Sequence, residues 1–143
     1  MAKLRLKLCQ SKMSVMDLSL KILLLFTLMQ VKHLFADFYF QTLWMLTGRD
    51  RYLHLGRTAH SAIHAGLSVV IFALFGTPLV WLLAIFVIEF AIHFHVDFWK
   101  ARENVVKQLT PEDAAFWRAM GFDQALHHLT GIGLIWLWIA YVV

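Results

Sequence analysis

Four apolar stretches of this 143-residue chain each carry a pair of metal-ligand-type side chains spaced four residues apart. The pairs are His33 and Asp37, His60 and His64, His93 and Asp97, and Asp123 and His127. In an α-helix, residues four apart lie on one face, about one turn from each other. Ionisable side chains within apolar segments are costly, and they usually face the interior of a helix bundle. The pattern therefore predicts one polar site that four helices build together.

The composition predicts an all-α integral membrane protein. Ordinary soluble domains carry about 25% charged residues, whereas this chain carries 15% and is 60% hydrophobic. Stretches of about 20 apolar residues are long enough to cross the hydrocarbon core of a lipid bilayer. The formal net charge of +4 lies mostly in the N-terminal tail and two loops. Contact with a membrane surface explains this charge, and no nucleic-acid partner is expected.

The hydropathy pattern predicts a basic N-terminal tail, residues 1–14, followed by a single four-helix transmembrane domain, residues 15–143. The four spans are expected at Val15–Asp37, Ala59–Phe75, Pro78–Trp99 and Gly121–Tyr141. A short interfacial helix is expected at Lys100–Leu109, and Thr110 with Pro111 is typical of the start of the next helix. Following the chain across the bilayer places all four pairs near one membrane face and both termini at the other. The excess of Lys and Arg on the loop side favours a cytoplasmic site by the positive-inside rule, whereas the basic tail before the first span favours the opposite orientation.

All members of the four pairs are candidate metal ligands. Histidine nitrogens and carboxylate oxygens suit a divalent metal ion, with zinc as the first choice and iron or manganese as alternatives. The single Cys9 excludes an intrachain disulfide and a cysteine cluster. The alternative interpretation is that the pairs are interhelical hydrogen bonds that fix the bundle.

Four acidic residues are candidate catalytic groups. Asp37, Asp97 and Asp123 are each a ligand or a general base, and Glu89 lies on the same helix stripe as Asp97, two turns deeper. Lys100 either receives an anionic headgroup or reaches the interface as a snorkelling lysine. No P-loop, dinucleotide-binding fingerprint or zincin motif is present.

The polar motifs resemble those of the domain-of-unknown-function 3307 family of small bacterial and phage membrane proteins. The resemblance rests on the segments that run from His33 to Gln41, from His93 to Lys100 and from Asp123 to His127, together with a histidine early in the second span. It covers about Leu28 to the C-terminus, and Ala36 stands where the family typically has glycine. The resemblance implies a compact helical domain of a bacterial inner membrane that shares these polar residues, and it implies no reaction.

Three functions are compatible with this sequence. The first is a metal-dependent hydrolase that acts at the membrane interface on a lipid-linked substrate. The second is an accessory or structural subunit of a larger membrane or phage assembly, or of a homo-oligomer. The third is a metal or proton transporter, for which the apolar far halves of the spans offer little support.

Overall fold

The computed structural model describes residues 2–143, with side chains from Asp17 onward. Every regular element in this range is a helix, which confirms the all-α class. The helices are α1 (Ala2–Phe38), α2 (Leu43–Leu46), α3 (Leu55–Leu74), α4 (Leu79–Val106) and α5 (Ala114–Tyr141).

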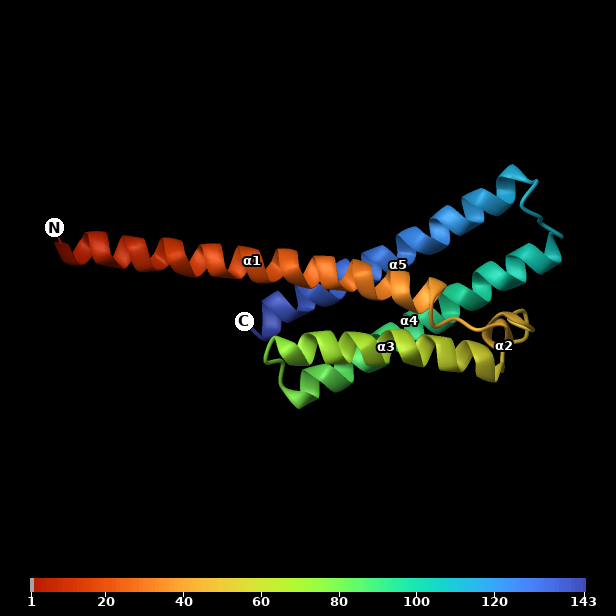
Figure 1. Ribbon diagram of the computed structural model, residues 1–143, viewed down its shortest axis with the longest axis horizontal. Helices are drawn as coiled ribbons and strands as arrows, with labels where there is room; N and C mark the ends of the chain where they lie inside the picture. Colours follow the sequence, from red (N-terminus) through yellow and green to blue (C-terminus); the bar gives the residue numbers. More distant parts are fainter. Residues whose placement is uncertain (1) are drawn as a thin grey trace.

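The four long helices run alongside one another and bring both termini to the same end (Figure 1). The short turn between α3 and α4 also lies at this end, whereas α2 and the connection between α4 and α5 lie at the opposite end. Helix α1 contacts α3 and α5, and α4 contacts the same two helices, so the long helices form a closed ring. As the sequence predicted, both termini lie at one end of the bundle and the two long connections lie at the other.

Two stretches are long and apolar enough to cross a membrane, Asp17–Phe38 and Leu79–Val106, whereas the sequence analysis predicted four spans. The other two long helices, α3 and α5, contain no stretch that meets both conditions. Within the described part of the chain, length and composition therefore identify α1 and α4 as the candidate membrane-spanning helices.

The boundaries of the helices correct two predictions and add one helix. Helix α4 continues without a break to Val106, so no separate interfacial helix occupies Lys100–Leu109. Helix α5 begins at Ala114, because Thr110 forms a turn in which its backbone N–H donates to Asp113 Oδ2 at 2.8 Å. The short helix α2 was not predicted, because four residues are too few to show a helical period.

The basic tail is continuous with the first predicted span, since α1 is helical from Ala2 onward. The side chains of the tail lie outside the described residues.

The apolar core lies between the polar pairs and the end of the bundle that carries the termini. Each long helix contributes residues that lie between its polar pair and this end. The buried core residues are Leu25, Met29, Ile71, Phe72, Ile85, Leu134, Ile135 and Trp138. Because these side chains are buried against one another, the core closes the bundle on that side.

Candidate metal centre

The structure brings all four predicted pairs into one buried polar cluster. His60, His64 and His93 have exposed fractions of 3% or less, and Asp97 and Asp123 are also buried. Spacing of four places both members of each pair on the inner face of one helix. The cluster thus receives side chains from α1, α3, α4 and α5.

Asp37, His60, His64 and His93 form the first group that can hold a metal ion, since each offers a ligand atom within 4.8 Å of the others. Asp37 Oδ1 lies 3.0 Å from His64 Nε2 and 3.3 Å from His60 Nε2. Two ligands on a tetrahedral zinc ion with bonds near 2.1 Å are about 3.4 Å apart. These two separations are therefore close to those of two ligands on one metal ion.

His93, Asp97 and His127 form the second group. Asp97 Oδ1 lies 3.3 Å from His127 Nε2, and Asp97 Oδ2 lies 3.8 Å from His93 Nε2. Asp97 Oδ2 is also 3.6 Å from His60 Nε2. His93 belongs to both groups, so the two groups are adjacent parts of one centre.

Several ligand-type atoms in this cluster are buried and make no hydrogen bond. They are His64 Nδ1, His93 Nε2, His127 Nε2, Asp97 Oδ2 and Asp123 Oδ1. Buried polar atoms in folded proteins nearly always have a hydrogen-bond partner. A metal ion is a partner that satisfies nitrogen and carboxylate oxygen together, so the donor set fits a divalent metal.

His33 and Asp123 lie beside the two ligand groups rather than within them. His33 Nε2 lies 3.2 Å from Asp37 Oδ2 and 3.0 Å from Gln124 Oε1. Asp123 Oδ1 lies 3.5 Å from His127 Nε2. Both contacts are of the kind that orients a metal ligand.

Glu89 lies outside both ligand groups and forms a buried ion pair with Lys32. Lys32 Nζ also donates to Ser68 Oγ at 3.0 Å, and both charged side chains are about 95% buried. A cavity of about 10 Å³, the size of one water molecule, borders this pair and His33. No role for Lys32 was predicted from the sequence; it lies on the inner face of α1, four residues before the buried Ala36.

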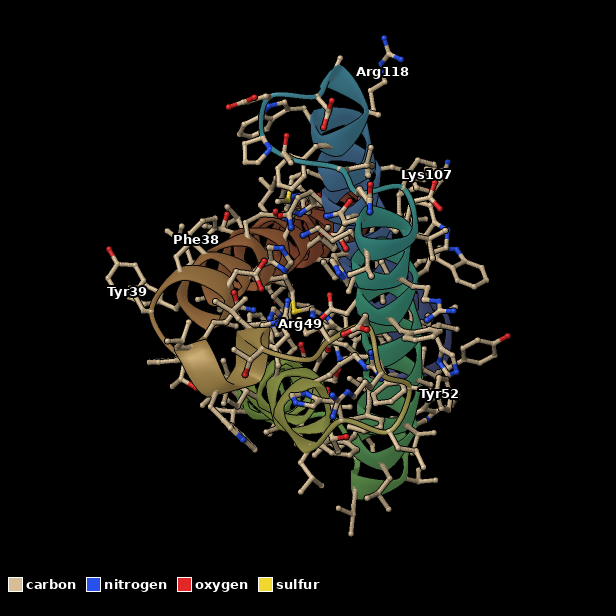
Figure 2. The ribbon with its side chains drawn as sticks, turned by 90° about the vertical axis from the view of Figure 1, so that its right-hand side faces the viewer. Phe38, Tyr39, Arg49, Tyr52, Lys107 and Arg118 are labelled. Carbon is tan, nitrogen blue, oxygen red and sulfur yellow. The ribbon has the colours of Figure 1, made fainter. Side chains whose placement is uncertain are left out.

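A cavity of about 110 Å³ borders the cluster at the end of the bundle that carries the loops. The charged residues in its wall are Asp37, Arg49, Asp97, Lys100 and Asp123. Figure 2 looks into this end, and Arg49 lies in the middle of the view while Lys107 and Arg118 lie at the rim. No pattern in the sequence pointed to Arg49, because its position depends on the path of the loop between α2 and α3.

The side chain of Arg57 on α3 holds the loop between α2 and α3 in place. Its guanidinium is fully buried and donates to the carbonyl oxygens of Arg49, Arg51 and Tyr52, with a distance of 2.6 Å to Arg51. It also lies 4.4 Å from the ring centre of Phe94 on α4. The loop that carries Arg49 is therefore attached to α3 and α4 through one side chain.

Replacing Arg57 by lysine is expected to lower the free energy of unfolding by about 2–4 kcal/mol, because an ammonium group cannot reach three carbonyl oxygens at once. Thermal unfolding in detergent measures the loss, and limited proteolysis between residues 47 and 54 reports on the loop. Arg51→Lys is the control, since the Arg51 residue is exposed. Equal stability and protease resistance of the Arg57 and Arg51 variants would contradict this role.

The remaining histidines lie around the centre. His95 is exposed and lies 3.1 Å from the Tyr52 hydroxyl, and His128 is half-buried with its ring 5.1 Å from that of His33. His54 is the N-cap residue of α3, where its Nδ1 accepts from the Arg57 backbone N–H at 3.3 Å. The peripheral placement of His95 and His128 agrees with helix periodicity.

Comparison with curated proteins and with solved structures finds no match. Comparison with protein families finds one whose description is a protein of unknown function, DUF3307, and its match covers residues 24–142. This range contains all four long helices in whole or in part and every residue of the candidate metal centre. The chain therefore belongs to the DUF3307 family.

Proposed function

We propose that this protein is an integral membrane protein that uses a divalent metal ion, with zinc as the first choice, to hydrolyse a lipid-linked substrate at the membrane surface. The observation that carries the proposal is the buried set of histidines and aspartates beside a cavity at one end of the bundle. Structural zinc sites are closed by four protein ligands, whereas catalytic sites keep a position open. Because Asp37, His60 and Asp97 line the cavity, a metal held by them could keep a coordination position open, as in catalytic sites.

The outer surface of the bundle supports four membrane spans, including α3 and α5. Large apolar side chains are exposed on all four long helices, for example Leu23, Val70, Val87 and Trp136, with exposed fractions between 58% and 63%. Soluble monomers rarely expose continuous apolar surface of this kind. The four polar pairs of the same helices face inward, as ionisable residues do in membrane bundles.

The aspartates that line the cavity suit proton transfer during hydrolysis. A bound divalent ion would polarise a substrate oxygen and make a water molecule more acidic. Asp97 and Asp123 both line the cavity and lie next to His127, so either carboxylate can accept a proton from water there. His33 holds Asp37 through their 3.2 Å contact.

The far end of the bundle supports hydrolysis over transport. Beyond the Lys32–Glu89 pair, the interior of the described bundle is filled by the apolar core around Leu25, Phe72 and Leu134. An ion that entered from the loop end would meet mainly apolar side chains there. The interpretation of the cluster as structural hydrogen bonds is disfavoured by its buried ligand-type atoms that make no hydrogen bond.

Purified protein in detergent should contain zinc or take it up in a fixed ratio to the chain, measured by mass spectrometry of the metal. Hydrolysis of fluorogenic ester and phosphate-ester lipids should stop when a chelator removes the metal and return when zinc is added. A protein that takes up no divalent metal, or whose hydrolysis is insensitive to chelation, would overturn the proposal.

A further inference from the structure

We propose that Arg49 and Lys100 form an anion-binding wall of the cavity, and that the substrate of the proposed hydrolase is a phosphate ester. This inference rests on the proposed function and names the class of its substrate. It follows from the position of the two cations, their partners and the charge of the cavity wall.

The two cations are held in the cavity wall with little exposure to solvent. The side chains of Arg49 and Lys100 are 13% and 17% exposed, whereas arginine and lysine are mostly exposed in folded proteins. Arg49 Nε donates to the Met45 carbonyl oxygen at 2.9 Å, which orients the guanidinium. With its amide oxygen towards Arg49, Gln41 accepts from Arg49 Nη2 at 2.5 Å. These contacts fix a planar, charged donor group at the cavity.

Both cations face carboxylates at distances that leave room for another acceptor. Arg49 Nη2 lies 3.7 Å from Asp97 Oδ2, and Lys100 Nζ lies 3.7 Å from Asp123 Oδ2. Charge-assisted hydrogen bonds between nitrogen and oxygen are typically about 2.7–2.9 Å long. The cations are thus attracted by the carboxylates without direct hydrogen bonds to them. Arginine and lysine are the residues that most often hold phosphoryl oxygens in this way.

The charge of the wall favours an anionic ligand once a metal is bound. The three aspartates exceed the two cations by one negative charge, while histidines must be neutral to bind a metal. One divalent ion changes the net charge from one negative to one positive. Net charge in a poorly solvated cavity is costly. A phosphate ester carries at least one negative charge and compensates this positive charge, whereas a neutral amide or carboxylic ester does not.

The size and surroundings of the cavity suit a headgroup. Its volume of about 110 Å³ is small beside the 300–1,000 Å³ of pockets that enclose a whole ligand. Phe38 is part of its wall, and Phe38 and Tyr39 are 73% and 69% exposed at the same end (Figure 2). Exposed aromatic rings are typical of the membrane interface, where lipid phosphates lie.

The reaction needs water as its co-reactant. A water oxygen bonds to phosphorus, and the ester bond between phosphorus and the alcohol oxygen breaks. A proton from the water passes to the carboxylate of Asp97 or Asp123, which then transfers it to the departing alcohol oxygen. The products are a phosphate with one more hydroxyl group and a free alcohol.

The experiment compares two lipids that differ only in the phosphoryl group. Zinc-loaded protein is mixed with micelles that contain phosphatidic acid or diacylglycerol with the same acyl chains, and binding is measured by calorimetry. Inorganic phosphate is titrated separately. We expect phosphatidic acid to bind more tightly than diacylglycerol. The double variant Arg49→Gln with Lys100→Gln should weaken its binding by about 10- to 100-fold at unchanged zinc content.

Matched controls are Lys107→Gln and Arg118→Gln. They remove cations that do not line the cavity, at the same end of the bundle, and should leave phosphatidic acid binding unchanged (Figure 2). Binding of inorganic phosphate as tight as that of phosphatidic acid would assign a soluble phosphate ester, and binding of phosphatidic acid alone would assign a lipid. Equal binding of the two lipids, or no effect of the double variant, would overturn the anion site. Phosphate binding by a protein that takes up no metal would instead overturn the proposed hydrolase.

Discussion

Replacing His93 by alanine is expected to weaken zinc binding by more than about 100-fold. His93 belongs to both ligand groups, so its loss removes a ligand from each of them. Loss of a residue that merely orients a ligand typically costs 10- to 100-fold in metal affinity, and the loss of a ligand should exceed this. Competition with a chelator of known affinity measures the change in detergent.

His95→Ala is the matched control, because His95 lies on the exposed face of the same helix two residues further on. It should keep the affinity of the unaltered protein for zinc. If His93→Ala kept that affinity and only unfolded at a lower temperature, the cluster would be a set of structural hydrogen bonds. Such bonds are worth about 0.6 kcal/mol each in membrane bundles, so that loss of stability would be small.

Replacing Lys32 by methionine is expected to lower the free energy of unfolding by about 3–5 kcal/mol, because the Glu89 carboxylate then stays buried without its counter-charge. For a chain of this length, this corresponds to a fall of the unfolding midpoint on the order of 10 °C. Thermal unfolding in detergent measures it. Zinc affinity should change much less, since neither residue belongs to a ligand group.

The double variant Lys32→Met with Glu89→Leu tests the cause of this loss. Removing both charges leaves no unpaired buried ion, and replacement of a buried ion pair by apolar residues is often neutral or stabilising. The double variant should therefore recover most of the stability. A double variant as unstable as Lys32→Met would show that packing, and not charge, accounts for the effect.

The placement of the four pairs could be predicted because it depends on two local properties of the sequence. A spacing of four fixes which residues share a helix face, and the alternation of spans and loops fixes the end of each helix that carries its pair. His60, His64, His93 and Asp97 lie together in the structure for these reasons. Family membership was also recognisable from short motifs around the same residues, and it is confirmed.

Which residues of the cluster belong to a ligand group, and which only contact one, could not be predicted. Whether His33 and Asp123 belong to a ligand group or contact one depends on the rotation of each helix and on side-chain rotamers, which helix periodicity leaves undefined. The partner of Glu89 was missed for a related reason. Lys32 lies 57 residues away in the chain, and no local pattern links the two.

The loop side was the least predictable part. Polarity suggested a separate helix after Trp99, but α4 continues because its charged residues are compatible with a helix that leaves an apolar environment. Arg49 reaches the cavity because Arg57 holds three carbonyl groups of the loop. Such tertiary hydrogen bonds from a side chain to the backbone leave no periodic trace in a sequence.

The apolar core at the end of the bundle that carries the termini has a consequence for how the protein meets its surroundings. The carboxylates border a cavity at the opposite end, and the core around Leu25 and Trp138 blocks the interior between the two ends. In the proposed membrane arrangement, the centre therefore samples lipids of one leaflet. When vesicles contain the protein in both orientations, lipid added from outside reaches only the molecules whose loops face outward. The sidedness of insertion, as well as the amount of protein, then determines the turnover that is measured.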